Sequence, residues 1–502
     1  MTRRESSEEL LFLGGNADSI DAFDQAIRGA SGVIQQSWRT RKRATVGTTY
    51  EDLRGELSKL TLCPEQGVGL EAVLAELAQE VIPHIVAVGH PEYAAHLHSV
   101  PMIPALAAEV LISATNQSLD SFDQAPSATV VERLVIEWLN QALGFASGDG
   151  IFTSGGTKSN LMGLLLARDE YALRQRGWDV SRQGLPPDAS KWRIFCSELS
   201  HFSVERSAAI LGLGEQAVVR IPADDRGVLV AEALSAAIAR ERALENQPFA
   251  LVLTAGTTDL GSIDALAEDA AVAREHGLWV HVDAAAGGAL ILSERYRQLL
   301  DGIALADSVT LDLHKLLFQP ISCGVFLTRR PDALGALRRE IPYLDPNDGE
   351  VEVGPNLVGK SIETTRRFDA LKAWVCLRAV GRQRLCALVD QMMSTARESA
   401  ALIASEPSLE LLASPTTSTV LFRWDPASAA VDTRQIDLMN RLLPQRLWRQ
   451  GGPVVGATKY QGRSALKLTL TNPRCTVDHV RGILRAVCAL ADQLLRSGAE
   501  TL

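Results

Sequence analysis

The sequence predicts an α/β protein with a mainly parallel central sheet. Between residues 150 and 327, short apolar and β-branched runs alternate with longer stretches in which apolar residues recur at helical spacing. Such alternation requires crossover connections, which cover both faces of a parallel sheet with helices. The expected strands are 151–153, 193–197, 217–221, 249–254, 278–283 and 308–313, and the expected helices are 158–175, 203–213, 231–244 and 265–276.

The flanking segments predict further parts. Apolar residues at helical spacing in 19–38 and 69–88, with a polar, Thr-rich stretch between them, indicate an N-terminal helical arm. Prolines at 101, 104 and 126 precede two more helices, and from about residue 380 amphipathic helices surround two strands, which is typical of a small α+β domain. We therefore expect an arm at 1–95, a large domain at 96–375 and a small C-terminal domain at 376–502.

Composition narrows the class of function. The 502 residues carry a net charge of −10, which argues against a nucleic-acid surface. No apolar run is long enough to span a bilayer, and the first apolar run is too short for a secretory signal. The 7 scattered cysteines include no CxxC pair, and the spacing of His90, His96 and His98 matches no common metal-ligand pattern. We expect a cytoplasmic protein that binds a small molecule, with no metal, nucleic-acid or membrane partner.

Lys315 is the strongest candidate for covalent chemistry. The strand 308–313 ends just before His314 and Lys315, and Leu316 to Phe318 follow. We expect the amine to lie among apolar side chains, where desolvation disfavours the ammonium form and makes the amine nucleophilic towards a carbonyl. The alternative is an ordinary strand-end lysine whose amine reaches water.

Three other motifs follow strands, where ligands gather in α/β sheets. The stretch 153–160 turns through two glycines into a helix, which suits a phosphate; the alternative is a tight turn capped by Thr157. His201 joins a strand to a helix and either caps the helix or lies flat on a cofactor ring. Thr258 is the expected contact in the hydroxyl-rich stretch 255–264, and the alternative is that turn formation alone explains the glycines there.

Asp283 ends a strongly apolar strand and is followed only by alanines and glycines. A carboxylate in such surroundings needs a cationic partner. A protonated cofactor ring nitrogen would serve, because the ion pair keeps the ring cationic and able to accept electrons. A buried salt bridge to an arginine is the alternative.

Taken together and in order, the motifs SGGTKSN, SHFSVERSAA, TAGTTDLGSID, HVDAAAGG and DLHKLLFQP resemble those of the pyridoxal-phosphate-dependent group II amino acid decarboxylases. The resemblance runs from about residue 90 to about 381 and implies the aspartate-aminotransferase fold, fold type I. Within the family, the segment 96–129 is most similar to bacterial decarboxylases of diamino acids such as 2,4-diaminobutyrate and lysine, from polyamine and siderophore pathways. The family also implies a homodimer with its site at the interface.

The resemblance implies roles for particular residues. Lys315 would hold pyridoxal 5′-phosphate as a Schiff base, Asp283 would pair with the ring nitrogen, and His201 would stack on the ring. Tyr343 would protonate the carbanion from a mobile loop, with residues 345–360 as a lid. The remaining cofactor contacts would be Gly155, Gly156, Thr157 and His314 at the phosphate with Asp312 nearby, and Thr258 and Ala285 along the ring.

The substrate is the least determined part. Aromatic-substrate relatives carry a tyrosine after HVDAA where this chain has Ala286, so we expect a diamino acid, with 2,4-diaminobutyrate, lysine and ornithine as candidates. A distal ammonium would need an acidic partner. The acidic candidates for this partner are Asp120, Asp123, Asp348, Glu350 and Glu352.

Arg366 and Arg367 either bind an anion or lie on a solvated helix face.

Two other hypotheses about the function remain open. An acidic amino acid decarboxylase, an aminotransferase or a carbon–sulfur lyase of this fold would use the same Lys315 and Asp283. A non-catalytic cofactor-binding regulator would need a DNA-binding module, and neither end of the sequence shows a basic helix-turn-helix pattern.

Overall fold

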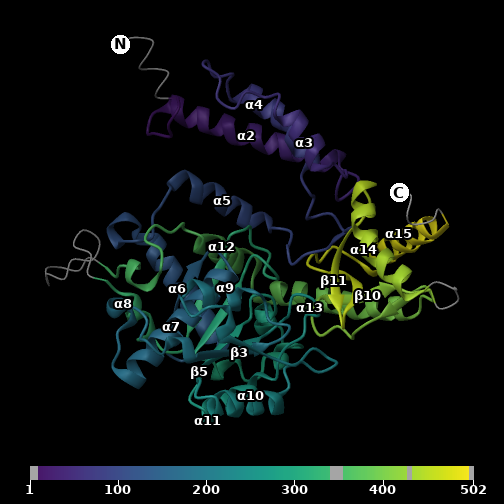
Figure 1. Cartoon of the computed structure of the whole chain (residues 1–502). Helices are drawn as coiled ribbons and strands as arrows, with labels where there is room; N and C mark the ends of the chain where they lie inside the picture. Colours follow the sequence, from purple (N-terminus) through teal and green to yellow (C-terminus); the bar gives the residue numbers. More distant parts are fainter. Residues whose placement is uncertain (1–9, 340–353, 427–431, 497–502) are drawn as a thin grey trace. The chain divides into compact units, whose positions relative to one another are not determined.

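The computed structural model describes residues 10–339, 354–426 and 432–496. The chain forms two compact units (Figure 1). The first comprises Met1–Ala95, Trp424–Leu466 and Asp478–Leu502, and the second comprises His96–Arg423 and Lys467–Val477. The three-part division expected from the sequence stays a prediction.

A seven-stranded sheet in the order β2-β8-β7-β6-β5-β3-β4 forms the centre of the second unit. Its strands from β3 to β7 pair in parallel, which confirms the mainly parallel sheet. Strand β8 runs antiparallel to both neighbours and was not predicted, because periodicity alone does not separate a five-residue apolar run from a buried loop. The strands are β2 Asp149–Thr153, β3 Trp192–Ser197, β4 Val218–Ile221, β5 Gln247–Thr254, β6 Trp279–Asp283, β7 Ser308–Asp312 and β8 Gly324–Thr328.

Helices of the second unit pack on this sheet. Helix α7 contacts β5, β6, β7 and β8, whereas α10 and α11 both contact β5. Apart from the edge strand β4, the strands are buried almost throughout, as a sheet covered on both faces requires. The helices are α5 Ile103–Thr115, α6 Pro126–Leu143, α7 Gly156–Arg176, α8 Val180–Gln183, α9 Ser203–Ile210, α10 Ala231–Ala243, α11 Leu266–Glu275, α12 Ala370–Val380 and α13 Arg382–Ala404.

Helix α12 begins at Ala370, so Arg366 and Arg367 precede the helix on whose face the sequence led us to consider them. The backbone there pairs with a distant segment instead. The N–H of Leu119 donates to the carbonyl oxygen of Arg366 at 3.0 Å, and Ser118 forms an antiparallel bridge with Arg367. These long-range bonds hold the chain extended up to Arg367, so the helix starts only after it.

The first unit contains the N-terminal helices α2 Ala17–Thr40, α3 Tyr50–Leu57 and α4 Leu70–Glu76. Helix α3 lies in the polar, Thr-rich stretch between the two expected helices, and Thr49 caps it by accepting from the N–H of Asp52. The expected helix 69–88 is regular only to Glu76; a π-helical turn and a 3-10 turn continue the chain to His84, where Pro83 lacks the N–H that a regular helix needs.

The C-terminal part supplies α14 Thr433–Arg449 and α15 Val477–Arg496. A second sheet has the order β1-β11-β12-β10-β9, with β1 Tyr93–Ala94, β9 Leu409–Leu411, β10 Thr419–Trp424, β11 Val454–Tyr460 and β12 Arg463–Thr469. Within the described residues, no helix combines the length and the apolar character needed to cross a membrane.

Candidate active site

A cavity of about 290 Å³ lies in the second unit, where β5, β6 and β7 end and α7 begins. Thr254, Asp283 and Asp312, the last residues of these three strands, all line it. Ligands gather at this end of parallel strands. All the residues that the resemblance assigned to the cofactor line this one cavity: Gly155, Gly156, Thr157, His201, Thr258, Asp283, Ala285, Asp312, His314 and Lys315.

The amine of Lys315 faces a carboxylate. Its Nζ lies 3.3 Å from Oδ2 of Asp312, and the N–H of Lys315 donates to the carbonyl oxygen of Asp312 at 3.1 Å, so one turn brings both side chains together. Leu316 and Phe318 are buried as expected. The prediction that the amine itself lies among apolar side chains is wrong, because the turn after β7 places Asp312 beside it.

His314 completes this end of the cavity. Its Nε2 lies 3.6 Å from Oδ2 of Asp312, and its Nδ1 accepts a hydrogen bond from the N–H of Cys323 at 3.1 Å. Burial lowers the pKa of His314, and the Asp312 carboxylate opposes that shift. Because Nδ1 accepts a bond, the neutral ring carries its proton on Nε2. The other oxygen of Asp312, Oδ1, is buried and has no hydrogen-bond partner among the described residues.

The start of α7 forms a close-fitting backbone cradle. Gly155 has φ +149°, and a Cβ on Gly156 would lie 3.0 Å from Oδ2 of Asp312 and 3.2 Å from Cβ of Ala285. No side chain caps the helix, so the alternative of a turn capped by Thr157 is wrong. The first amides of a helix lack partners within the helix and attract anions.

Asp283 is buried at the end of β6 with uncharged donors only. Its Oδ2 accepts from Nδ2 of Asn160 at 2.7 Å, and its Oδ1 accepts from the N–H of Ala285 at 3.1 Å. The alternative of a salt bridge to an arginine is wrong: within the described part of the chain, hydrogen bonds from these two groups take its place. A buried carboxylate that borders a cavity in this way favours a cationic ligand.

His201 borders the cavity directly before α9. Its Nδ1 lies 2.8 Å from Oγ of Ser203 and accepts from the N–H of Ser203 at 3.2 Å, so the ring also caps the start of the helix, as one of the two readings expected. Burial lowers the pKa of His201, and the Asp283 carboxylate opposes that shift. A neutral, flat ring therefore forms part of the cavity wall.

The model of the pyridoxal-dependent decarboxylase conserved domain matches residues 58–425. The chain belongs to this family. It is a pyridoxal-phosphate-dependent amino acid decarboxylase, a carboxy-lyase, as the sequence motifs predicted.

Relatives and solved structures agree with this assignment. The chain is 43% identical to the L-2,4-diaminobutyrate decarboxylase of Rhizobium meliloti (strain 1021), across 96% of this chain and 94% of the relative. The same-named protein of Acinetobacter baumannii is 39% identical, across 96% and 95%. Human cysteine sulfinic acid decarboxylase is 34% identical, across 90% and 92%.

The fold of this chain is compared with that of one solved structure. It is the glutamate decarboxylase domain of diaminobutyrate-pyruvate transaminase and L-2,4-diaminobutyrate decarboxylase from Vibrio parahaemolyticus. It superposes with a TM-score of 0.89 at 35% identity and covers 98% of this chain and 100% of its own. The predicted aspartate-aminotransferase-like fold is confirmed.

The decarboxylase cavity fits pyridoxal phosphate in three respects. The start of α7 offers an anion cradle that a Cβ at Gly156 would fill. Asp283 offers a buried carboxylate to a cationic ring nitrogen, and Lys315 offers an amine to the aldehyde. The residues present therefore match the phosphate, the ring and the reactive carbon of the cofactor.

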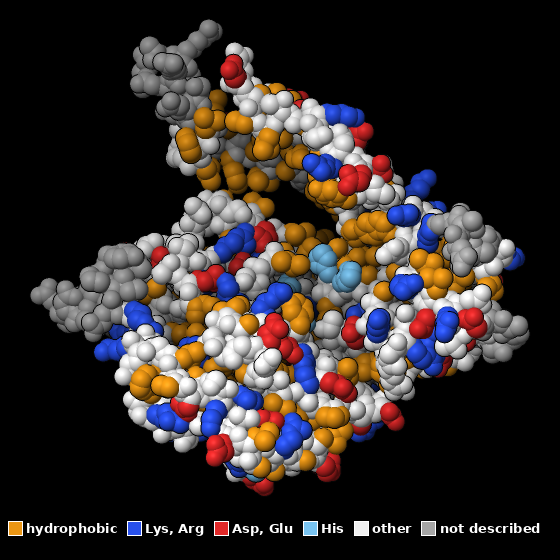
Figure 2. Space-filling view, viewed as in Figure 1, with side chains coloured by type: hydrophobic (Ala, Val, Ile, Leu, Met, Phe, Trp, Pro, Cys, Tyr) orange, Lys and Arg blue, Asp and Glu red, His pale blue; other side chains and the backbone are white. Residues whose placement is uncertain are grey.

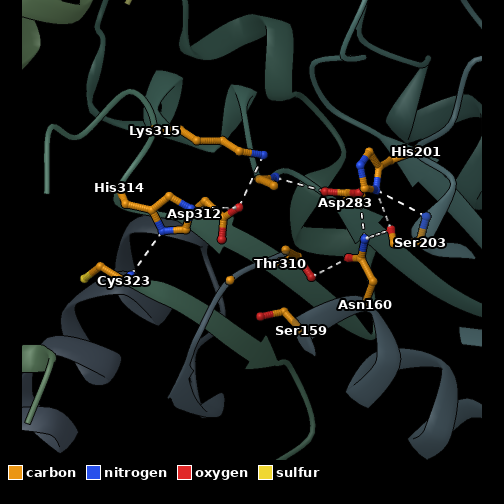
Figure 3. A network of polar contacts seen from close by, with 12 residues as sticks. Ser159, Asn160, His201, Ser203, Asp283, Thr310, Asp312, His314, Lys315 and Cys323 are labelled. Carbon is orange, nitrogen blue, oxygen red and sulfur yellow. Dashed lines mark hydrogen bonds and ion pairs between the residues drawn. The ribbon is translucent and has the colours of Figure 1, made fainter. Parts of the chain in front are cut away.

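Several neighbours were not expected from the sequence. A buried polar network joins Asp283 to His201 through Asn160 and Ser203, and it extends to Thr310 (Figure 3). His281 also belongs to it, since its Nε2 lies 3.0 Å from Oδ1 of Asn160. Asn160 lies inside the quoted SGGTKSN motif, so the motif carried it without revealing its role. Polar residues such as His281 and Thr310 inside otherwise apolar strands are a usable signal, since buried polar groups require partners.

Other expected residues fall elsewhere. Tyr343, Asp348, Glu350 and Glu352, with residues 345–353 of the expected lid, lie outside the described residues. Asp120 is buried and Asp123 exposed, and neither lines the cavity. Among the described residues, no group of His, Cys, Asp and Glu is placed to hold a metal ion.

Arg366 and Arg367 are part of the protein framework. Nη1 of Arg366 lies 2.7 Å from Oε1 of Glu132, and both side chains are buried. Arg367 pairs with Glu109 and with Asp369. Both arginines are thus engaged with carboxylates of the chain. The solvated surface considered for them is wrong for buried Arg366, whereas Arg367 is exposed to solvent, although it precedes α12 instead of lying on it.

Proposed function

We propose that this decarboxylase acts on a diamino acid, with L-2,4-diaminobutyrate as the first candidate and lysine and ornithine as the others. The observation that carries the proposal is the identity of 43% and 39% to two L-2,4-diaminobutyrate decarboxylases, across nearly the whole of each chain. The product would be a diamine, a precursor for polyamine or siderophore synthesis.

In this proposal, the residues on different walls of the cavity have different roles. Lys315 would attach the cofactor, the start of α7 and His314 would hold the phosphate, and Asp283 would hold the positive charge on the ring nitrogen. When bound, the cofactor accepts the electron pair that the departing carboxylate leaves behind. The ion pair with Asp283 favours this by keeping the ring cationic.

The remaining residues would orient the substrate and control the proton. His201 would lie against the ring face, and Thr258 and Ala285 would line its edge. The carbonyl oxygen of Thr258 accepts from Nζ of Lys467 at 3.0 Å, and that amine also pairs with Asp259 at 2.9 Å, which fixes the loop. After loss of carbon dioxide, Tyr343 or His201 would donate a proton to the former α-carbon, which yields the amine.

The size of residue 286 supports a non-aromatic substrate. Ala286 lines the cavity beside Ala285, and an alanine leaves space where aromatic-substrate relatives carry a ring. An acidic substrate is the strongest competitor, because human cysteine sulfinic acid decarboxylase is 34% identical to the chain.

A homodimer belongs to this proposal. Helix α2 exposes Ile20, Ile27, Ile34 and Trp38, all of which are at least 38% exposed. Figure 2 shows hydrophobic side chains gathered on this N-terminal segment. An apolar row at helical spacing on a surface helix favours association, and a second copy of the chain is the occupant that we propose. Sedimentation of the purified protein would give twice the 54.2 kDa chain mass, and a monomer would contradict the proposal.

The substrate is tested by measuring released carbon dioxide with a panel of L-amino acids. We expect 2,4-diaminobutyrate, lysine or ornithine to be turned over far faster than glutamate, cysteine sulfinate, tyrosine or tryptophan. A preference for cysteine sulfinate or glutamate would overturn the diamino proposal. Accumulation of a keto acid with pyridoxamine phosphate would instead indicate transamination.

A further inference from the structure

A buried chain of polar side chains lies behind the cavity and connects two of its walls (Figure 3). Asp283 on β6 and His201 before α9 both touch it, and Asn160 on α7 lies at its centre. Asn160 is 1% exposed. The other members are likewise buried: Ser203, Trp279, His281, Ser308 and Thr310.

The orientation of the Asn160 amide follows from its neighbours. One end lies 2.7 Å from Oδ2 of Asp283, which only accepts hydrogen bonds, so that end must be the NH₂ group. The same NH₂ group lies 2.9 Å from Oγ of Ser203. The opposite end must then be the carbonyl oxygen.

The carbonyl end of Asn160 fixes the tautomer of His281. Oδ1 lies 3.0 Å from Nε2 of His281 and only accepts, so Nε2 must carry a proton. Burial lowers the pKa of His281 to about 4, so the ring is neutral and its Nδ1 accepts. Ser308 then donates to Nδ1 at 2.8 Å, and its own oxygen accepts from Nε1 of Trp279 at 2.9 Å.

The NH₂ end of Asn160 acts on the tautomer of His201 through Ser203. Because Oγ of Ser203 accepts from Asn160, its single proton is available to Nδ1 of His201 at 2.8 Å. The N–H of Ser203 also donates to that nitrogen at 3.2 Å. Neutral His201 therefore carries its proton on Nε2, which makes no hydrogen bond to any described residue.

We propose that Asn160 is a positioning residue that orients the Asp283 carboxyl group through its hydrogen bond and helps to set His201 as the tautomer protonated on Nε2. One amide thereby orients an acceptor on one wall of the cavity and an N–H donor on another. The inference rests on the proposed roles of Asp283 and His201 in the decarboxylase, but the proton positions can be measured without any turnover.

Neutron diffraction from crystals of the full-length deuterated protein, with and without pyridoxal phosphate, locates these protons directly. At a pH near 8 we expect deuterium on Nε2 and none on Nδ1 of His201, and deuterium on Nε2 of His281. Deuterium on Nδ1 of His201, alone or together with Nε2, would overturn the proposal. The result does not depend on which amino acid is decarboxylated.

Asn160→Asp tests the contact to Asp283 by replacing the donor with a second carboxylate. We expect the dissociation constant for pyridoxal phosphate, measured by fluorescence titration, to rise about 30-fold or more. The matched control is Asn440→Asp, because Asn440 is also 1% exposed and its Nδ2 also donates twice, to the carbonyls of Trp424 and Ile436. If a folded Asn160→Asp protein binds the cofactor as tightly as the control does, the proposal is wrong.

Ser203→Ala tests the contact to His201 and serves if Asn160→Asp does not fold. Loss of the hydroxyl donor to Nδ1 should raise the pKa of His201 by about half a unit or more. The charged groups that act on this ring, Asp283, Asp312, Lys315 and Arg206, are unchanged in the variant.

The titration uses histidine labelled with carbon-13 at Cε1, and a His201→Gln variant assigns the signal. Ser200→Ala is the control, since the Ser200 hydroxyl is also buried in this loop but lies 3.0 Å from Oγ1 of Thr254. Equal pKa values of His201 in the two serine variants would contradict the proposal.

Discussion

The two carboxylates that end adjacent strands in the cavity are held in opposite ways. Asp283, at the end of β6, accepts from two uncharged donors, Asn160 and the N–H of Ala285. Asp312, at the end of β7, lies beside Lys315 and His314, and one of its oxygens has no described partner. The β6 end is organised before any ligand arrives, whereas the β7 end contains an ion pair that must change once Lys315 reacts.

This difference predicts which substitutions matter most. Asp283 would carry a permanent charge for the cofactor, and no other group in the cavity would replace it. Asp312 pairs with Lys315, and it would lose that partner when the cofactor is attached. We therefore expect large effects at Lys315 and Asp283 and a small one at Asp312.

The largest effect is expected for Lys315→Ala. The variant should bind pyridoxal phosphate only non-covalently and lose roughly 10⁴-fold or more in turnover, because no amine then holds the reactive carbon. Released carbon dioxide and the absorption spectrum measure both effects. Lys191→Ala, at an exposed lysine paired with Glu245, is the control and should behave like the wild type.

Asp283→Ala should follow, with a loss of roughly thousands-fold in kcat/KM, since the ring nitrogen loses its counter-charge. Asp283→Asn keeps the shape and separates charge from packing. Steady-state kinetics of both variants measure the effect. Near-normal turnover in either would show that this carboxylate does not keep the ring protonated.

Tyr343→Phe should change the product more than the rate. Cofactor binding should remain, while aldehyde and pyridoxamine phosphate appear beside the amine, because the proton would return to the cofactor carbon. Product analysis by mass spectrometry measures the ratio. An unchanged ratio would transfer the donor role to His201 and would connect it to the tautomer set by Asn160.

Asp312→Asn should cost about tenfold or less in kcat/KM, as the ion pair that it removes exists only before the cofactor is attached. The measurement is the same kinetic assay. A loss in kcat/KM as large as that of Asp283→Ala would show that Asp312 matters as much as Asp283, which would contradict the expected difference between them.

The smallest effect that we expect concerns the pH dependence of stability, through the buried carboxyl group of Asp269. Both oxygens of this group lack hydrogen-bond partners among the described residues. Burial, with help from Asp264 and Glu268, raises its pKa to about 7. A raised pKa in the folded state means that stability is fully present near pH 4 and falls as the pH rises through 7.

Asp269→Asn should remove part of that fall. From pH 5 to pH 8, we expect the free energy of unfolding of the variant to rise by on the order of 1 kcal/mol relative to that of the wild type. Urea unfolding at the two pH values measures the free energies. An equal loss in both proteins would show that Asp269 is not protonated in the folded state.

The sheet and some of the cavity residues could be predicted from local signals in the sequence, and the family resemblance supplied the other cavity residues. Alternating apolar runs define β3 to β7, and motifs at strand ends contain Lys315, Asp283 and His201. Contacts made across the fold left no local signal. The amine of Lys315 was misplaced because the turn to Asp312 is a three-dimensional feature, and Arg366 was unassigned because its partner Glu132 lies far away in sequence.

The partners of buried polar residues on helices and strands were the hardest feature to predict from the sequence. Asn160 and His281 act through partners on other elements, and a single sequence does not show which buried polar groups will meet. Strand β8 was missed for a similar reason, since its pairing with β2 and β7 rather than its composition makes it a strand.

The most direct test of the account is the identity of the lysine that holds the cofactor. Borohydride reduction of the purified yellow protein should abolish its visible absorption band and fix the cofactor on the chain. Peptide mapping by mass spectrometry should then find the reduced cofactor on Lys315. Lys158 lines the same cavity and pairs with Glu363, so it is a genuine competitor. Recovery of the modification on Lys158, or on any lysine other than Lys315, would contradict the account.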